Sequence, residues 1–263
     1  MKPDLSAVRL FLFDMDGTLY LGDRLFDFAN SLLAAIREKG KRYLFITNNS
    51  SKSVKAYVEK LQALGVAATE DDCLTSSQAP AHYLQAHHAG KTLYVCGTQS
   101  LKAELCENGF AVTDDPAKTE CIVVGYDTEL TYKKLWDISE MLETRDLPYI
   151  ATNPDTVCPT VFGSVPDCGS ICEMLFAATG KRPTVIGKPS PLMIRLAMEK
   201  ARCTPQETAV VGDRIYTDVQ SGINAGAVSV LVMSGETTKE ILASSAAKPD
   251  FVLGDAGELI HYL

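Results

Sequence analysis

Near its amino terminus the chain reads VRLFLFDMDGT, residues 8–18. A short apolar run followed at once by acids and glycine is typical of a buried strand that ends in a sharp loop. Ligands of open α/β sheets bind at the carboxyl ends of the strands, so the pattern predicts Asp14 and Asp16 at the mouth of a site. Gly17 lets the backbone turn there, so that both carboxylates can reach one reacting group.

Two neighbouring carboxylates can divide the work of a displacement reaction. An ionised Asp14 can attack phosphorus, while Asp16, kept protonated by like-charge repulsion, acts as general acid. The Thr18 hydroxyl can bind phosphoryl oxygens. An ordinary strand-end turn is the alternative, because Asp and Gly are common in turns. A calcium loop starting at Asp14 is disfavoured, because its twelfth position needs Glu and holds Leu25.

Two segments downstream carry groups that suit phosphate. The apolar run RYLFITNN, residues 42–49, ends in Thr47 and Asn48, whose hydroxyl and amide groups can bind phosphate oxygens. The segment GKPSP, residues 187–191, follows a short strand-like stretch, and its Lys188 supplies a fixed positive charge. Taken singly, each has an ordinary alternative as a helix cap, a turn or a solvated lysine.

A further apolar run, AVVGDRIYTD at residues 209–218, ends in Asp213 and Asp218. Acids at the end of a strand suit Mg²⁺, which binds few protein carboxylates and bridges to substrate phosphate. Acids at a helix start are the ordinary alternative. Arg214 between them either attracts phosphate or lies on the surface.

In this order the four segments resemble the four motifs of the haloacid dehalogenase superfamily, in its phosphatase branch. The segments TNNS (47–50), ATNPD (151–155) and GKPSP (187–191) further resemble subfamily IIA. That subfamily holds nitrophenyl phosphatases, the N-acetylglucosamine-operon phosphatase, and the pyridoxal phosphate and phosphoglycolate phosphatases. The likeness covers essentially the whole chain.

The resemblance implies a role for each group that handles phosphate. Asp14 becomes an aspartyl phosphate, and Asp16 protonates the leaving alcohol and then activates water. Thr47, Asn48 and Lys188 hold the phosphoryl group, together with Thr18.

The resemblance also implies a Mg²⁺ site. Asp14, the backbone carbonyl of Asp16, and Asp213 bind the metal. Asp218 binds it directly, supports its shell or orients Lys188. Phosphoryl transfer depends mainly on positioning and charge neutralisation, which explains two cations around one carboxylate.

Asp16 separates this chain from neighbouring chemistries of the superfamily, because dehalogenases lack that acid and ion-pumping members carry Thr there. We therefore expect a Mg²⁺-dependent phosphatase that hydrolyses small phosphomonoesters such as sugar phosphates, nucleotides and nitrophenyl phosphate. A phosphotransferase or phosphomutase that uses the same intermediate remains an alternative. So does a phosphate-ester sensor with incidental hydrolysis.

The chain has 263 residues, a length at which a single hydrophobic core usually gives way to two domains. Its motifs also leave a long gap between Asn49 and Gly187. Strand and helix signals alternate within that gap, which implies an inserted domain. We predict a doubly wound, parallel-sheet Rossmann-like core formed by residues 1–77 and 184–263. A smaller α/β cap, residues 78–183, is inserted between them.

The cap is expected to select the alcohol of the substrate, because the four motifs hold only the phosphoryl group. The candidates are Asp167, Cys168, Gly169 and Ser170. Relatives commonly have Gly at the Asp167 position. If Asp167 faces the site, its charge disfavours substrate carboxylates and favours neutral polyols or amine-bearing groups; a solvent-facing loop acid is the alternative.

The net charge and the cysteine content limit the classes of partner and the compartment that we expect. The net charge is −8 and the 25 Lys and Arg residues are scattered, which disfavours nucleic-acid binding. The apolar run 8–13 is too short to span a bilayer. Eight irregularly spaced cysteines without a signal segment are typical of reduced thiols in a cytoplasmic protein. The resemblance also allows a homodimer formed through the cap.

Overall fold

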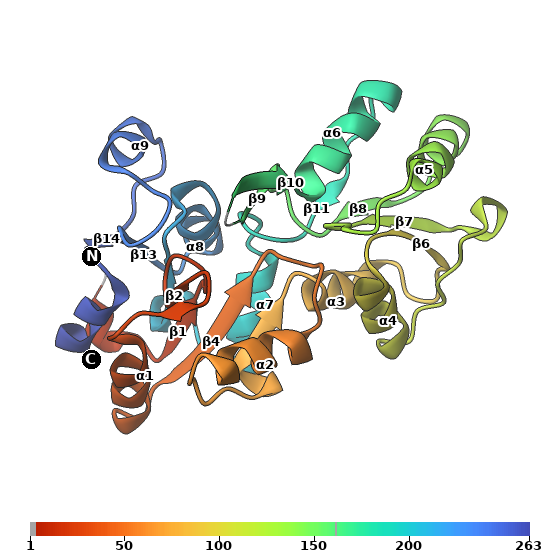
Figure 1. Cartoon of the computed structure of the whole chain (residues 1–263). Coiled ribbons are helices and arrows are strands. Elements are labelled where there is room, and N and C mark those ends of the chain that lie inside the picture. Colours follow the sequence, from red (N-terminus) through yellow and green to blue (C-terminus); the bar gives the residue numbers. More distant parts are fainter. Residues whose placement is uncertain (1–3, 161) are drawn as a thin grey trace. The chain divides into compact units, whose positions relative to one another are not determined.

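The structure is a computed structural model that describes residues 4–160 and 162–263 (Figure 1). Its residues form two compact units. The first contains the residues up to Thr47 together with Tyr57–Leu74 and Lys188–Leu263. The second contains Asn48–Ala56 and Thr75–Gly187. The polypeptide therefore passes between the units four times, after Thr47, Ala56, Leu74 and Gly187.

A six-stranded sheet forms the centre of the first unit, in the order β14-β13-β12-β1-β4-β5. Its strands are β1 (Leu10–Phe13), β4 (Arg42–Thr47), β5 (Cys73–Thr75), β12 (Thr208–Gly212), β13 (Val228–Val232) and β14 (Phe251–Leu253). Leu10 pairs in parallel register with Arg42 on one side and Thr208 on the other. Every residue of β1 is buried, as expected of a central parallel strand covered on both faces. The strand order reverses between β1 and β12, where such sheets bind their ligands.

Helices flank this sheet. They are α1 (Ala29–Glu38), α2 (Val54–Ala63), α7 (Leu192–Ala201), α8 (Gln220–Ala225) and α9 (Lys239–Ser244). Helix α1 packs against β4, and α7 packs against β1. The unit also has a hairpin of β2 (Tyr20–Leu21) and β3 (Arg24–Leu25), a π-helix at Ile215–Val219, and 3₁₀ helices at Leu5–Ala7, Glu70–Asp72, Pro205–Glu207 and Ala256–Tyr262. The predicted doubly wound α/β fold is confirmed.

The second unit has a parallel four-stranded sheet in the order β11-β8-β7-β6. Its strands are β6 (Leu93–Cys96), β7 (Cys121–Val124), β8 (Tyr149–Ala151) and β11 (Thr184–Val185). Its other elements are α3 (Gln78–His87), α4 (Gln99–Glu107), a 3₁₀ helix at Pro116–Lys118, α5 (Tyr132–Thr144), α6 (Cys168–Thr179) and a hairpin of β9 (Val157–Thr160) and β10 (Gly163–Pro166). Ile122, Ile138 and Ile171 belong to the buried cluster that joins β7, α5 and α6. Among the described residues, no helix combines the length and the apolar character that crossing a membrane requires.

The second unit extends further along the chain than the sequence suggests. Thr184 pairs with Ile150, so β11 adds an edge strand to this sheet, whereas the sequence places the return to the core near Thr184. Helix α6 starts at Cys168, where the Asp167 side chain caps it. That this unit selects the substrate stays a prediction.

Candidate active site

Three carboxylates gather at the reversal of strand order in the first unit. Asp14 follows β1, Asp213 follows β12, and Asp218 lies in the π-helix. One carboxylate oxygen from each lies within 4.8 Å of the others. The sequence brings them together because the carboxyl ends of adjacent parallel strands share one edge of the sheet.

Lys188 lies inside this cluster and is only 2% exposed. Its Nζ donates to Asp14 Oδ1 at 2.6 Å and to Asp218 Oδ1 at 2.5 Å. Burial disfavours the ammonium, but the two carboxylates outweigh burial and raise the pKa of Lys188. The lysine is therefore a fixed cation.

The acids are crowded and shielded from water. Burial raises the pKa of Asp14 to about 8; the charges of Asp218 and Asp213 add to the rise, and Lys188 opposes it. Burial, followed by the charge of Asp218, raises the pKa of Asp213 to about 6. When all three acids are ionised, one ammonium leaves two negative charges uncompensated, which a divalent cation would neutralise.

Two glycines make room for the Asp213 carboxylate. A Cβ built on Gly17 would lie 2.5 Å from Asp213 Oδ2, and one on Gly235 would lie 2.0 Å from it. Gly17 also has φ +83°, which favours glycine. The Glu236 amide donates to Asp213 Oδ2 at 2.7 Å, and the Thr18 hydroxyl donates to Oδ1 at 3.4 Å. These contacts fix the direction of the carboxylate.

Asp218 is held in a similar way. A Cβ on Gly212 would lie 2.4 Å from Asp218 Cβ, so only glycine fits before Asp213. The Arg214 amide donates to Asp218 Oδ2 at 3.0 Å, and the Asp218 amide donates to the Arg214 carbonyl at 2.9 Å. The π-helical turn thus returns Asp218 toward the strand end, as π-helical turns often do at functional sites.

The other predicted phosphate-handling residues are placed differently. Asp16 is exposed in the turn after β1, and its Oδ1 accepts from the Gly22 amide at 3.4 Å. Thr47 ends β4 and is partly exposed. Asn48 is buried in the second unit, where its Nδ2 donates to Asp155 Oδ2 at 3.1 Å. The phosphate-binding roles of Thr18, Thr47 and Asn48 stay predictions.

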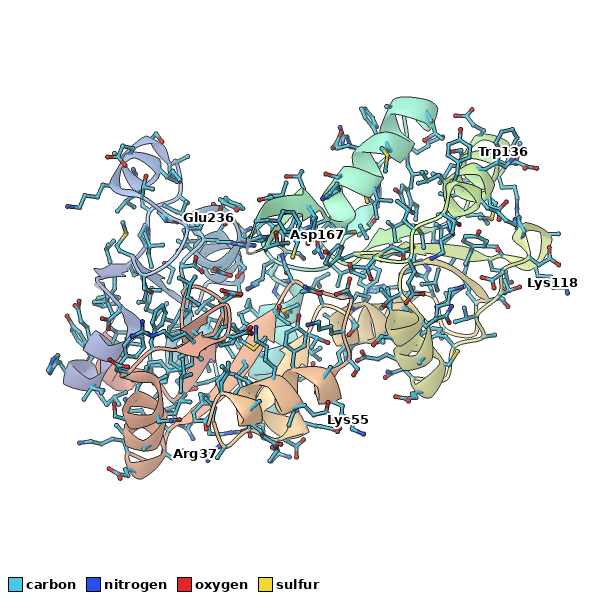
Figure 2. All side chains as sticks on the ribbon, viewed as in Figure 1. Arg37, Lys55, Lys118, Trp136, Asp167 and Glu236 are labelled. Carbon is cyan, nitrogen blue, oxygen red and sulfur yellow. The ribbon has the colours of Figure 1, made fainter. Side chains whose placement is uncertain are left out.

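The four candidates for substrate selection form the start of α6. Asp167, labelled in Figure 2, is 4% exposed, and its carboxylate accepts from the Cys168 amide. The Cys168 thiol donates to the Val124 carbonyl at 3.3 Å. A Cβ on Gly169 would lie 2.2 Å from a backbone oxygen, and the Ser170 hydroxyl donates to another backbone carbonyl at 2.5 Å. All four therefore lie at the start of α6 in close contact with other parts of the second unit, and their effect on substrate choice stays a prediction.

Sequence reasoning missed the loop after β13. Ser234 donates from Oγ to the Gly17 carbonyl at 2.7 Å, and Glu236 Oε2 pairs with Arg214 Nε at 2.9 Å (Glu236 is labelled in Figure 2). Arg214 thus has an acidic partner. The loop follows β13, the neighbour of β12 in the sheet, so its position at a strand end was the signal that could have identified it.

Comparison with known proteins identifies the family. The family model described as haloacid dehalogenase-like hydrolase matches residues 11–111, and a second, HAD-hydrolase-like model matches residues 185–259. A 5′-nucleotidase, YutF of Bacillus subtilis, is 33% identical over 259 residues, covering 98% of this chain and 100% of that protein. The chain belongs to the haloacid dehalogenase-like hydrolases.

Other relatives agree along the full length. An acid sugar phosphatase of Staphylococcus aureus strain USA300 is 32% identical over 98% of this chain and 99% of that protein. The crystal structure of a 4-nitrophenylphosphatase from Thermotoga maritima is 40% identical, with a TM-score of 0.93 over 98% of each chain. The predictions of a haloacid dehalogenase-like fold and of a phosphatase of this family are confirmed.

Proposed function

We propose that this protein is a Mg²⁺-dependent hydrolase of small phosphomonoesters that works through an aspartyl phosphate on Asp14. One observation carries the proposal. The Asp14 carboxylate lies at the end of β1, accepts a hydrogen bond from the buried Lys188, and has an oxygen within 4.8 Å of carboxylate oxygens of Asp213 and Asp218. A nucleophile between a fixed cation and a cluster of hard oxygen ligands suits the attack on a phosphoryl group.

The residues present fit Mg²⁺. The cluster offers only carboxylate oxygens, the ligands that hard cations prefer, and its charge needs a dication. Asp14, Asp213 and the Asp16 carbonyl would hold the ion, with Asp218 supporting them. When bound, the ion neutralises and orients phosphoryl oxygens.

The side chains then divide the reaction. The Asp14 carboxylate attacks phosphorus, and Lys188 holds the oxygens of the phosphoryl group, assisted by the Thr47 hydroxyl and an amide group of Asn48. Asp16, two residues along the turn and exposed, gives a proton to the leaving alcohol. It then takes a proton from the water that attacks the phosphoaspartate.

Phosphate release from a panel of esters tests the reaction class. The panel holds sugar phosphates, nucleoside monophosphates, pyridoxal phosphate, glycolate phosphate and nitrophenyl phosphate, each with Mg²⁺ or with a chelator. We expect turnover that depends on Mg²⁺. An accumulated sugar bisphosphate would indicate a mutase, and tight binding without turnover would indicate a sensor. No turnover by folded, Mg²⁺-loaded protein would contradict the proposal.

Asp16→Asn separates the two chemical steps. Nitrophenolate needs little protonation to leave, so the first step should persist while hydrolysis of the phosphoaspartate slows about a hundredfold or more. Stopped-flow absorbance should show a burst of about one nitrophenolate per enzyme, followed by slow turnover. Alkyl phosphates, which need the acid, should show no burst. A variant with wild-type steady-state turnover would exclude the acid–base role.

Gly235→Ala tests the packing against Asp213. The added methyl would displace a carboxylate that contributes to the proposed metal site. Changes to residues that support a metal ligand typically weaken metal binding about tenfold or more, so we expect a rise of that size in the Mg²⁺ concentration needed for half-maximal activity. Gly222→Ala is the matched control, since its Cβ would first meet Val210 Cβ at 3.2 Å. Unchanged Mg²⁺ activation in Gly235→Ala would contradict this role.

We also propose a cytoplasmic protein that dimerises through its second unit. None of the eight cysteines, all of which lie in the described part of the chain, forms a disulfide, as is usual in a reducing compartment. Tyr132 and Trp136 lie one turn apart on α5 and are 76% and 62% exposed (Trp136 is labelled in Figure 2). Light scattering of the wild type and of Trp136→Glu tests the dimer. A wild-type monomer at all concentrations would contradict it.

A further inference from the structure

The backbone of Asn48 is held by two side chains from distant parts of the second unit. Its carbonyl oxygen accepts from Asn153 Nδ2 at 2.6 Å and from the Ser76 hydroxyl. Asn48 is 7% exposed, and its two partners are fully buried. Residues that are 28 and 105 positions away in sequence therefore fix one peptide group.

The side chain of Asn48 is held as well. Its Nδ2 donates to Asp155 Oδ2 at 3.1 Å. The Asp155 amide donates to Asn153 Oδ1 at 3.0 Å, which ties the two partners to each other. Asn153 and Asp155 thus hold both the carbonyl and the side chain of one asparagine. We call Asn48, Ser76, Asn153 and Asp155 the Asn48 clamp.

A second chain segment packs onto the same clamp. The Gly187 amide donates to the Thr152 carbonyl at 2.8 Å. A Cβ on Gly187 would lie 2.4 Å from that carbonyl oxygen and 2.8 Å from Asn48 Oδ1. Asn48 and Gly187 are the peptide neighbours of Thr47 and Lys188, the residues proposed to hold the phosphoryl group. The clamp therefore fixes the residue next to each of them.

Stability alone is a poor reason for such a cluster. Burying amides and a carboxylate costs free energy that hydrogen bonds only partly return, and apolar replacements often stabilise as well or better. The second unit already has an extensive apolar cluster around Ile122 and Ile171. What a network of buried hydrogen bonds adds is a defined geometry.

We propose that Asn153 and Asp155 are positioning residues of the reaction: by holding Asn48, they set the Thr47 hydroxyl and the Asn48 amide for the phosphoryl group. The inference rests on the proposed function. It gives a role to the segment TNPD, residues 152–155, which lies outside the four motifs. It also gives the Asn48 side chain a hydrogen-bond partner in the protein.

Asp155→Ala removes the acceptor for the Asn48 side chain. Because hydrogen bonds to charged groups are strong, we expect kcat/KM to fall about ten- to a hundredfold. The inhibition constant for inorganic phosphate should rise with it. Asp155→Asn keeps an acceptor oxygen and should restore kcat/KM to within about threefold of wild type. The control is Tyr94→Phe, which removes the buried 2.7 Å bond to Asp137 in the same unit. It should lower Tm and leave both kinetic quantities unchanged.

A donor–acceptor exchange distinguishes positioning from direct binding. Asn48→Asp places two carboxylates together and should lower kcat/KM about tenfold or more. Adding Asp155→Asn restores one donor and one acceptor, and most of the activity should return. No recovery in the folded double variant would overturn the inference, because it would mean that the Asn48 side chain itself binds phosphate.

The two proposals can fail separately. If the wild type hydrolyses no ester, the proposed function fails. If the wild type is active, and Asp155→Ala and Asn48→Asp are folded with wild-type kcat/KM and phosphate inhibition, only the positioning role is overturned. The isosteric exchange keeps the test open if Asp155→Ala does not fold.

Discussion

Asp14→Asn should lower phosphatase activity by about four to six orders of magnitude, because an amide cannot attack phosphorus and no neighbouring group replaces it. The expectation follows from the site's geometry, in which Asp14 directly follows β1 and its carboxylate accepts a hydrogen bond from Lys188. Acid-quenched wild type should carry the mass of one phosphoryl group on the peptide that contains Asp14. The variant should carry none.

The same substitution should stabilise the metal-free protein. Burial raises the pKa of Asp14 from 3.8 to about 8, so the folded state binds its proton more tightly than the unfolded state does. The contribution of the protonated Asp14 carboxyl group to the free energy of unfolding is therefore complete below about pH 4 and is lost as the pH rises toward about 8. Asparagine does not titrate, so the Tm difference in favour of Asp14→Asn should grow over this range. Mg²⁺ should reverse the order, because it stabilises the carboxylate.

A conservative exchange elsewhere controls for this result. Asp71→Asn makes the same chemical change at a side chain that is 96% exposed, and should alter neither activity nor the dependence of Tm on pH. Turnover by Asp14→Asn within tenfold of the wild type would contradict the nucleophile. A Tm of metal-free Asp14→Asn below that of the wild type at pH 8 would contradict the conclusion that repulsion and burial of the three carboxylates destabilise the metal-free site.

The catalytic centre was predictable because its residues sit at strand ends. Asp14, Thr47 and Asp213 each follow an apolar run, and the rule for ligand sites in parallel sheets places them on one edge. The spacing of Asp218 was also visible. The π-helical turn that returns it to Asp213 was not, since that turn depends on the absence of a side chain at Gly212.

Other contacts are tertiary and leave little local signal. The Thr18 hydroxyl donates to a carboxylate 195 residues away, and the Asn48 side chain to one 107 residues away. The sequence left Asp167 open as a solvent-facing loop acid, whereas it is buried and caps α6. Strand β11 is only Thr184–Val185, too short for its sheet to be assigned from pattern alone.

Lys188→Met should have the second large effect, on stability and activity together. The variant removes the ammonium but keeps much of the volume, and leaves Asp14 and Asp218 buried without their cation. Breaking a buried ion pair by removing one partner costs about 3–5 kcal/mol. The loss of a donor to the phosphoryl oxygens should lower kcat about a hundred- to a thousandfold. Denaturation without metal and steady-state assays with saturating Mg²⁺ measure the two effects.

The dependence on pH and Mg²⁺ identifies the cause of that instability. Because Lys188 opposes the rise in the pKa of Asp14, its removal raises that pKa further, and the stability deficit should shrink as pH falls toward about 4. Mg²⁺ should raise Tm more in Lys188→Met than in the wild type, because the variant has more uncompensated carboxylate charge at the metal site. Lys134→Met is the control: it breaks the 2.7 Å pair with the buried Asp127 in the second unit, and should lower Tm without changing kcat or the Mg²⁺ effect. Equal responses of the two variants to Mg²⁺ would mean that Lys188 stabilises the fold without balancing a metal site.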